Sequence, residues 1–381
     1  MASAGLWQNR FGAIGARGGG LSVILAAKRT AVVPRGGAFA KLEIEDLGAP
    51  VVQALLEAAG VSAWQVDELI CSNALGAGGN PARRVALSAG LPERVAGLSV
   101  DRQCAGGLDA ILLARALVDL GAADVVIAGG VESYSRRPLR LWTDPDGGPA
   151  IAYDQARFTP WGDRDPSMAE AAFGLAERLG ISRHSQDAWA VESHAKARVC
   201  HGEIVEVAGQ GRDAFARGLS LAVAARAKVV CGSITAANAA VAADAAAFVL
   251  VVSDKIAADF QSGRGVRIRG GVTLGGEPVV PGLAPVAAIR AVLDRAGVSV
   301  DKVAVAEIME AYAVQAMACV AGAGLAVARV NVGGGALARG HPIGASGAVL
   351  AVRLFYELKA GMGLAAIAAA GGIGTALLVE R

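Results

Sequence analysis

Aromatic side chains are scarce in this sequence: Phe, Trp and Tyr make up 4% of its 381 residues, although 54% of the chain is hydrophobic. The core must therefore be built from Ala, Val, Leu and Ile. An excess of one charge is also missing, because 36 Lys and Arg nearly balance 34 Asp and Glu, which argues against a nucleic-acid partner. No uncharged apolar run reaches the ~20 residues of a membrane span, so no membrane partner is expected either.

Closely spaced cysteines are missing too. The five cysteines are odd in number, lie far apart and never form a Cys-x-x-Cys pair, which predicts free thiols in a reducing compartment. We therefore expect a cytoplasmic protein. Two histidines lie near one cysteine, but no second pair completes a ligand set, so no metal site is expected. The residues concerned are Cys71, Cys104, Cys200, Cys231 and Cys319, and His184, His194, His201 and His341.

Acidic residues are missing from the first 20 positions, which contain two arginines and end in a glycine run. The solid apolar segment of a secretory signal is not present there, and a transit peptide remains an alternative. We expect residues 1–20 to form a flexible or mis-started N-terminal extension.

Glycine, in contrast, is abundant: its 51 residues are roughly twice its ordinary share, which predicts many tight turns. Apolar strand patterns and amphipathic helix patterns alternate along the first third of the chain, which predicts an α/β sheet. We expect strands at 21–28, 66–75, 96–101 and 123–130, and helices at 44–61, at 80–91 and directly after Cys104.

The alternation is interrupted by a long excursion. Residues 133–167 are rich in Pro, Gly, Trp and Arg, and two helices are expected at 168–180 and 182–202. Strand-like sequence resumes at 246–254. Long insertions of this kind usually form lids or interfaces, so residues 132–229 are predicted to form an inserted lid domain over the site.

The opening pattern returns from residue 266. A helix at 282–298 matches the one at 44–61, a helix at 348–360 matches the one after Cys104, and 363–380 resembles 121–133. Two half-chains with the same order imply a duplicated α/β fold of two similar βαβ halves in layers. The predicted halves are residues 21–131 with 230–265, and residues 266–381.

Cys104 lies at the expected start of a helix, in the stretch "DRQCAGGLDAI". The unpaired N–H groups there favour a thiolate, which makes Cys104 a candidate nucleophile. Gly106 and Gly107 would let a substrate approach backbone donors that stabilise an oxyanion. A buried helix-start cysteine without a chemical role is the alternative.

His341 occupies the equivalent place in the second half. It lies in a Gly-His-Pro turn within the glycine-dense segment 331–354, just before a helix. A duplicated fold would bring the two helix starts together across its pseudo-twofold axis, with both helices inside. His341 is therefore the candidate base for Cys104, within ~10 Å of it.

Three motifs together resemble those of the thiolase family of acyl-CoA C-acyltransferases. Residues 101–111 are similar to the family's active-cysteine motif, residues 307–316 ("EIMEAYAVQA") to its Asn-Glu-Ala-Phe motif, and residues 331–348 to its histidine motif. The resemblance runs in one order from about residue 21 to 381, and it implies the duplicated thiolase fold. It also implies that Cys104 accepts an acyl group from an acyl-CoA and that His341 activates it.

The resemblance includes departures at two chemical positions. Ala368 stands where the family has the cysteine that deprotonates the second acyl-CoA, and Ala370 stands at the following glycine. Met309 replaces the residue that holds an oxyanion-stabilising water, and a thioether is only a weak acceptor. Tyr312 replaces a phenylalanine, which is a mild change. Acylation is therefore expected to be intact, and the carbon–carbon step to be weakened.

The resemblance also implies a binding site for the acyl-CoA. Ser167, directly before the lid residue Met168, stands where the family has a histidine. Ala240 and Val223 each stand where the family has a serine. Glu310 is a further candidate for moving a proton. The substrate- and CoA-binding residues implied are Ser167, Met168, Arg217, Ser220, Asn238, Ala240, Ala311, Tyr312 and Gly372.

Two classes of function are compatible with these residues. The first is an acyltransferase that forms an acyl-enzyme on Cys104, with a carbon nucleophile, alcohol, amine or water as acceptor; water would make it an acyl-CoA hydrolase. The second is a non-catalytic thiolase-like subunit that binds acyl groups or partners. A dehydrogenase is excluded, because no G-x-G-x-x-G follows the first strand. No tightly bound cofactor is expected, only a CoA thioester as substrate, and the resemblance implies a homodimer or homotetramer.

Overall fold

The structure is a computed structural model that describes residues 22–76, 78–197, 202–260 and 265–381. The expectation about residues 1–20 and the residues Cys200 and His201 lie outside this range. The four cysteines within it are free thiols: Cys71, Cys104, Cys231 and Cys319. Among the described helices, none has the length and apolar character needed to cross a membrane.

The first half consists of strands and helices that alternate as predicted, with bounds that are shifted by a few residues or shortened. The sequence folds into β1 (Val23–Thr30), α1 (Ile44–Ala59), β3 (Glu68–Ser72), α2 (Pro81–Ser88), β4 (Leu98–Val100), α3 (Gly106–Asp119), β5 (Val125–Glu132) and, after the inserted segment, β11 (Ala243–Val252) and α7 (Asp254–Asp259). Short strands β2 (Val33–Pro34) and β8 (Ile204–Val205) pair with β11 and β1.

The second half repeats the alternation. Its elements are β12 (Val266–Gly275), α8 (Ala284–Ala296), β13 (Val303–Ile308), α9 (Ala313–Ala323), α10 (Ala336–Arg339), α11 (Ile343–Glu357), β14 (Met362–Ala369) and β15 (Ile373–Glu380). The stretch 363–380, expected to match one strand of the first half, is an antiparallel pair, because Gly371 and Gly372 at φ 78° and 80° turn the chain back.

The strands of both halves form one path in the order β13-β14-β15-β12-β1-β11-β5-β3-β4. The halves meet where β1 pairs with β12 at Val23 with Arg267 and Ile24 with Val266. The sequence predicts two stacked halves, and the structure adds that their sheets are joined edge to edge at this point.

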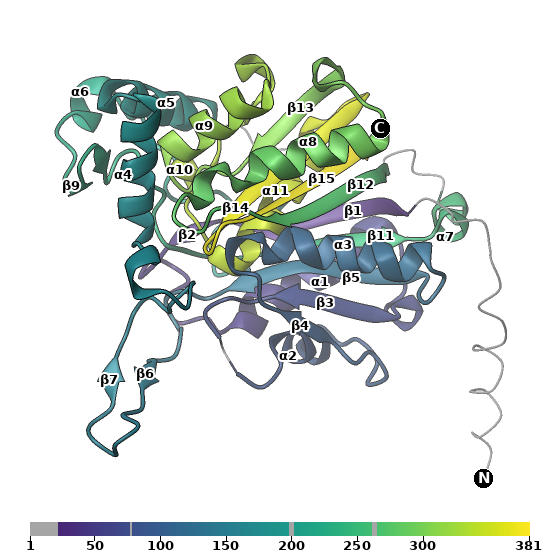
Figure 1. The fold of residues 1–381 in the computed structure, drawn as a ribbon. Helices are drawn as coiled ribbons and strands as arrows, with labels where there is room; N and C mark the ends of the chain where they lie inside the picture. The colour runs from purple at the N-terminus through teal and green to yellow at the C-terminus, as the bar shows by residue number, and fades with distance from the viewer. Residues whose placement is uncertain (1–21, 77, 198–201, 261–264) are drawn as a thin grey trace, which may run out of the picture.

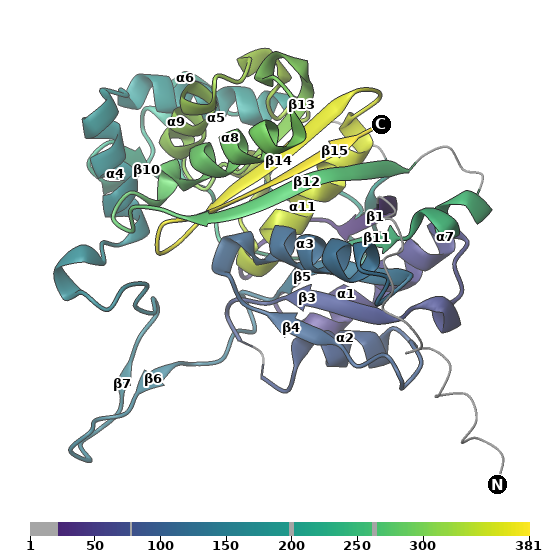
Figure 2. The ribbon, with the colours of Figure 1, turned by 45° about the vertical axis from the view of Figure 1, so that its right-hand side comes forward.

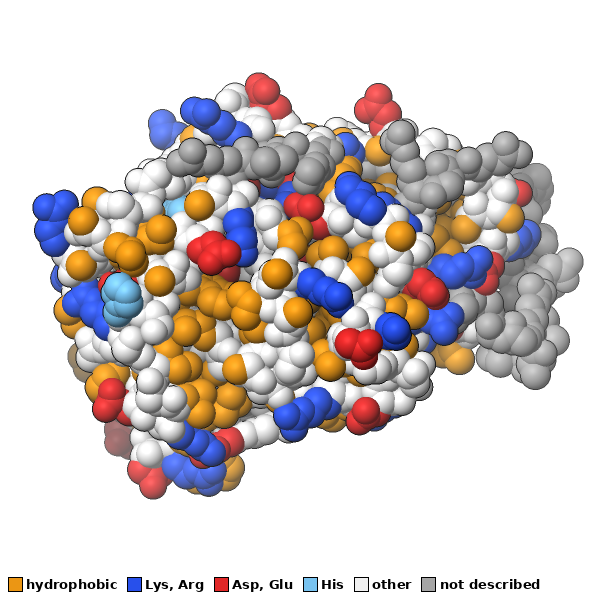
Figure 3. Space-filling model, turned by 90° about the horizontal axis from the view of Figure 1, so that it is seen from above, with side chains coloured by type: hydrophobic (Ala, Val, Ile, Leu, Met, Phe, Trp, Pro, Cys, Tyr) orange, Lys and Arg blue, Asp and Glu red, His pale blue; other side chains and the backbone are white. Residues whose placement is uncertain are grey.

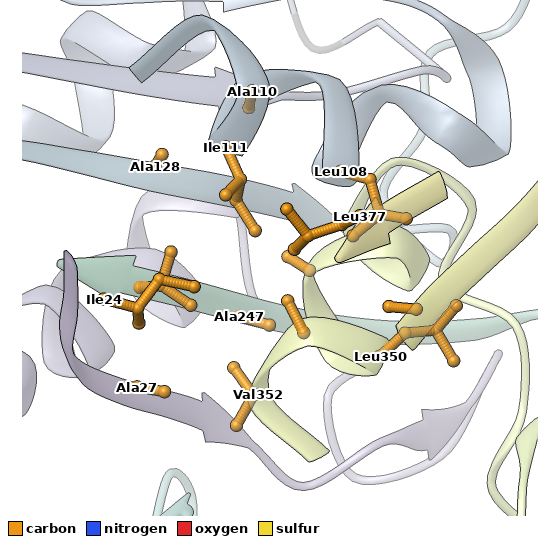
Figure 4. Close-up of a cluster of buried hydrophobic side chains, with 14 of the residues drawn as sticks. Ile24, Ala27, Leu108, Ala110, Ile111, Ala128, Ala247, Leu350, Val352 and Leu377 are labelled. Atoms are coloured by element: carbon orange, nitrogen blue, oxygen red, sulfur yellow. The ribbon is translucent and has the colours of Figure 1, made fainter. Parts of the chain in front are cut away.

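Helices α3 and α11 lie between the two parts of the sheet (Figures 1 and 2). Both contact strands of each half, α3 through β5 and β15 and α11 through β11 and β14. Their apolar faces share one buried cluster of small and branched side chains, among them Ala27, Ile111, Ala247, Val352 and Leu377 (Figure 4). Helices α1 and α2 cover the far side of one half, and α8 and α9 cover the other (Figure 2).

The inserted segment has two parts rather than one lobe. A thin hairpin of β6 (Leu141–Trp142) and β7 (Ile151–Ala152) projects away from the body (Figure 1). Helices α4 (Met168–Leu179) and α5 (Arg183–Lys196) instead pack against α9. The short helix α6 (Leu221–Ala224) follows within the predicted segment, and the small β-strand pair β9 (Val229–Cys231) and β10 (Ile234–Thr235) lies at and beyond its predicted end at residue 229. The exact limits of the three predicted domains remain predictions.

Helix ends follow local chemistry. Helix α4 begins at Met168 because the Ser167 side chain accepts from the backbone N–H of Glu170, whose carboxylate accepts from the N–H of Ser167. Helix α8 ends at Gly297, whose φ of 64° closes the last turn. Helix α11 begins at Ile343, five residues before the predicted start at 348, so that its first turn directly follows His341.

Candidate active site

Cys104 lies in a 3-10 turn, Gln103–Ala105, that leads directly into α3. Gln103 has a left-handed φ of 49°, and its N–H donates to the Asp101 carboxylate at 2.7 Å. The turn contacts α11, β14 and β15, all from the second half. Cys104 is thus the half-buried end of a first-half helix that faces the second half.

The two glycines after Cys104 have a packing role. A Cβ on Gly106 would lie 2.1 Å from the Ser72 Oγ, and one on Gly107 would lie 2.5 Å from the Ala348 backbone nitrogen. Both glycines are buried against protein. The expectation that they admit substrate is therefore wrong: they let α3 approach β3 and α11 closely.

His341 meets Cys104 as predicted. Its Nε2 lies 3.1 Å from the Cys104 Sγ, and its Nδ1 lies 2.6 Å from the Ser346 Oγ. The Ser346 hydroxyl donates to the Pro342 carbonyl at 3.1 Å, so it accepts from Nδ1–H. Nε2 is then the unprotonated nitrogen that can take the thiol proton. Sequence analysis missed Ser346, although it lies within the histidine motif.

Burial keeps the Cys104–His341 pair neutral. It raises the pKa of Cys104 to about 12, with smaller contributions from the negative charges of Glu132 and Asp101, and it lowers the pKa of His341 to about 4. The sequence predicts a lowered thiol pKa, which is wrong for the resting pair because desolvation outweighs the helix start. A neutral thiol beside an unprotonated ring nitrogen can pass its proton to Nε2.

The two residues at which the resemblance implies departures, Ala368 and Met309, lie on β14 and directly after β13, and β14 contacts the turn that holds Cys104. Ala368 is half-buried near the end of β14, opposite Gly374 on β15. Met309 follows β13, donates its N–H to the Ala366 carbonyl and belongs to the apolar cluster on which Cys104 packs. A methyl group and a thioether thus occupy positions that offer no proton carrier and no strong hydrogen-bond partner.

Tyr312 forms a polar edge of the site. Ala311 accepts from the Ala240 N–H at 2.9 Å, and Tyr312 bridges to Ala239, so these predicted binding residues lie together. Burial is the main cause that raises the pKa of Tyr312 to about 12, with smaller contributions from its neighbours Cys104 and Cys231. The phenol is therefore a neutral donor near two thiols. Nothing in the sequence indicated that Cys231 lies in this neighbourhood.

Glu310 is a buried hub. Its carboxylate accepts from Trp189 Nε1 at 3.0 Å, Ser193 Oγ at 2.7 Å, Asn331 Nδ2 at 2.9 Å and the Leu337 N–H at 3.2 Å. These donors come from α5, from the loop between α9 and α10, and from α10 itself. Glu310 thus ties the inserted segment to the chain leading to His341, and its role in moving a proton stays a prediction.

The other predicted binding residues are spread over the inserted segment and its surroundings. Arg217 is exposed, with its guanidinium 4.1 Å over the Phe215 ring, and Ser220 caps α6. Asn238 is buried and its amide is engaged by Thr235, Asp187 and Ser233, so it orders the chain before Ala240. The structure records no hydrogen bond from the described residues Ser167, Met168, Arg217, Ser220, Asn238 and Gly372 to Cys104 or His341.

Gly372 is needed as glycine. Its φ is 80°, its carbonyl accepts from the Gly276 N–H at 2.6 Å, and a Cβ would lie 2.7 Å from the Gly276 oxygen. It fixes the turn that follows Ala368 on β14. Within the described part of the chain, no three His, Cys, Asp or Glu side chains gather as a metal site would require.

Comparison with known proteins assigns this fold. Residues 22–255 match the family model for the thiolase N-terminal domain, and residues 264–381 match that for the thiolase C-terminal domain. The chain belongs to the thiolase family. The predicted family, the duplicated thiolase fold and the class of acyl-CoA acyltransferase enzyme are thereby confirmed.

Individual thiolase relatives cover nearly the whole chain. The "Putative acetyl-CoA C-acetyltransferase YhfS" of Bacillus subtilis is 41% identical over 375 residues, which span 94% of this chain and 99% of that protein. The similarly named VraB of Staphylococcus aureus is 36% identical over 384 residues, with the same coverage. The crystal structure of the Bacillus anthracis acetyl-CoA acetyltransferase superposes with a TM-score of 0.86 at 31% identity, covering 95% of this chain and 99% of that one.

Proposed function

We propose that this thiolase forms an acyl-enzyme on Cys104 from an acyl-CoA and has a weakened carbon–carbon condensation and thiolysis step. The observation that carries the first part is the chain of contacts from Cys104 Sγ to His341 Nε2 at 3.1 Å, and from His341 Nδ1 to Ser346 at 2.6 Å. It is the arrangement of a nucleophile, its base and a group that orients the base.

The proposed half-reaction balances without any further reagent. The Cys104 sulfur attacks the thioester carbonyl carbon while its proton passes to His341 Nε2. The tetrahedral intermediate then expels the CoA sulfur, which takes that proton from the imidazole. One thioester is broken and one is formed, so the step is nearly neutral in energy. Because burial keeps both Cys104 and His341 uncharged at rest, no thiolate–imidazolium ion pair forms before the substrate arrives.

The weakened second step is inferred from Ala368 and Met309, where the resemblance implies departures. Removing a proton from the α-carbon of a second acyl-CoA needs a base, and the methyl of Ala368 cannot act as one. The enolate also needs a donor, and Met309 has none to offer. Loss of a general base typically costs ~10²–10⁴ in rate.

The test is intact-mass spectrometry of the protein mixed with acetyl-CoA and with longer acyl-CoAs. We expect the mass of one acyl group to be added in wild type and none in Cys104→Ser, with free CoA released in equal amount. If no acyl-CoA modifies the protein, the non-catalytic alternative replaces the proposal. Continuous CoA release without any acceptor would point to the hydrolase.

The same reasoning extends to the protein's surroundings. We propose a homodimer or homotetramer in the cytoplasm that binds no cofactor besides its CoA substrate. The free thiols Cys71, Cys104, Cys231 and Cys319 support the reducing compartment, and membership of the thiolase family supports the CoA substrate. Figure 3 shows acidic and basic side chains scattered together over the upper face, with no basic patch of the kind a nucleic acid would select.

A further inference from the structure

Arg339 is a buried arginine two residues before His341. Only 3% of it is exposed. Its Nε donates to the Asp213 carboxylate at 3.0 Å, and its two terminal nitrogens donate to the carbonyls of Gly333 and Gly334. Arg339 is the last residue of α10, so its guanidinium folds back and ties the end of this helix to the start of its own loop.

Asp213 holds this guanidinium from another part of the chain. It belongs to the inserted segment, and its two oxygens also accept from Arg29 on β1, at 2.6 and 2.9 Å, and from the Val32 N–H at 2.9 Å. The carboxylate therefore bridges the first half of the fold, the inserted segment and the loop that carries His341. Because Arg29 alone engages both oxygens, Asp213 stays paired if Arg339 is removed.

The link from Arg339 to His341 is short and constrained. Gly340, between them, has a φ of 119°, and a Cβ there would lie 2.8 Å from Ala243. The His341 N–H donates to the Val241 carbonyl at 2.7 Å. The imidazole is thus placed by two anchors: the backbone bond to Val241 after Gly340, and the Arg339 guanidinium before it.

We propose that Arg339, held by Asp213, is a positioning residue that sets the distance from His341 Nε2 to the Cys104 sulfur. It contacts neither residue and acts only through the α10 loop. For its effect on acyl transfer, the inference rests on the proposed function; for its effect on the Cys104–His341 pair, it does not.

Arg353 provides a matched control. It is also buried, with 1% exposed, and it joins the same network of charges through Glu203, which pairs with Arg29 as well. Its hydrogen bonds go to Glu203 and to Glu357 on its own helix, α11, and not to the His341 loop. Removing Arg353 therefore disturbs the buried charges and the packing of its guanidinium beside Gly333, while all three hydrogen-bonding groups of Arg339 keep their partners.

The experiment compares Arg339→Met, Arg339→Lys and Arg353→Met with wild type in two measurements. One is the rate at which iodoacetamide alkylates Cys104 between pH 5 and 9, followed by peptide mapping. The other is the rate and acyl-CoA concentration dependence of Cys104 acylation, followed by intact mass. Thermal unfolding shows that each variant is folded.

In wild type, a neutral His341 serves as base over the whole range, so alkylation should vary little with pH. In Arg339→Met the rate should fall roughly 10- to 100-fold, as a misplaced base predicts, and should rise with pH because only free thiolate then reacts. Acylation should slow by the same factor with little change in the acyl-CoA concentration for half-maximal rate. Arg339→Lys, which keeps the charge but not the fork of donors, should recover part of both rates.

Arg353→Met should lose thermal stability yet keep both rates within threefold of wild type. Wild-type rates and a flat pH profile in Arg339→Met would overturn the inference, as would an equal slowing by Arg353→Met. If Arg339→Met does not fold, a wild-type rate and pH profile in Arg339→Lys would overturn it. If wild type is alkylated but never acylated, the proposed function fails, while the alkylation comparison still decides the role of Arg339.

Discussion

At the scale of single residues, the proposed chemistry depends on the transfer of the Cys104 thiol proton to one nitrogen of His341. The hydroxyl of Ser346 donates its hydrogen bond to the Pro342 carbonyl, so it accepts a hydrogen bond from His341 Nδ1. This fixes which imidazole nitrogen is bare. Burial then prevents both Cys104 and His341 from carrying charge at rest. The pair is a poised proton donor and acceptor rather than a stored thiolate.

Replacing Ser346 with Ala should therefore slow Cys104 acylation roughly 10- to 100-fold, because the imidazole loses the acceptor that fixes its tautomer. The wild-type rate should stay flat from pH 8 to about pH 5 and fall as the pH approaches the lowered pKa of His341, about 4, where Nε2 is protonated. Single-turnover acylation followed by intact mass measures both effects.

Ser346→Thr is the control, because it keeps the hydroxyl. Recovery of most of the rate in Ser346→Thr would assign the loss to the hydrogen bond. A Ser346→Ala variant with unchanged acylation would show that His341 needs no orienting partner, and a rate that declines near pH 7 would contradict the neutral-pair assignment.

Sequence reasoning reached Cys104 and His341 because both are reactive residue types at matching places in a repeat. It could not reach Ser346, since a serine in a helix is ordinary and only the 2.6 Å contact reveals its role. It also misjudged the thiol pKa, because burial is a property of the folded chain and not of the spacing of residues. Arg339 was equally hidden, since its partner Asp213 lies 126 positions away.

At the scale of secondary structure, local sequence patterns predict most helices and strands. The residues at which they begin and end depend on the neighbouring strands, caps and turns. Helix α2 starts where Pro81 supplies the first turn and Asn80 caps it. The strand predicted at 66–75 shortens to Glu68–Ser72, because it pairs with β4 and β5 over that stretch alone. Gly371 and Gly372 turn the last strand back as a pair, which the matching pattern of the first half did not indicate.

The exposed edge strand β4 indicates where two copies of the chain could associate. It lies at the end of the sheet path, pairs only with β3 among the described strands, and exposes 45% of Leu98. A free strand edge with an apolar side chain is a template for pairing with a second chain. We expect wild type to be at least a dimer by light scattering, and Leu98→Lys to shift it toward monomer.

Leu139→Lys is the matched control, since Leu139 is also highly exposed but precedes the projecting β6–β7 hairpin. If Leu98→Lys keeps the wild-type mass while Leu139→Lys lowers it, the contact involves the hairpin and not β4. A monomeric wild type would remove the prediction altogether.

At the scale of the whole molecule, the two halves of the duplicated fold each carry one member of the Cys104–His341 pair. The candidate nucleophile lies on the turn before α3 in the first half, and its candidate base lies before α11 in the second half. The layering of these two helices between the sheets brings residues 237 positions apart to 3.1 Å. The proposed acylation thus requires both halves, whereas Met309 and Ala368, where the resemblance implies departures, both lie in the second half, near β13 and β14.

The two partial reactions should therefore separate. Acetyl-CoA should acylate Cys104, while condensation of two acetyl-CoA molecules, and cleavage of acetoacetyl-CoA by free CoA, should be slow or absent. The triple variant Ala368→Cys, Ala370→Gly and Met309→Asn restores the proton carrier, the turn and the polar site. It should raise cleavage more than acylation, and single changes should do little, because groups that act as a unit are not additive.

Loss of the acetoacetyl-CoA enolate absorbance measures cleavage, and intact mass measures acylation of the same preparations. The triple variant in a Cys104→Ser background is the control, since it keeps the restored groups but lacks the nucleophile. Turnover by the unmodified protein near an ordinary enzyme rate, ~10 s⁻¹, would mean that another residue carries the proton. Glu310 is a poor substitute, because its carboxylate is already shared among four donors. His341, which gives up its proton to CoA after acylation and is then neutral again, would be the first residue to test as that base.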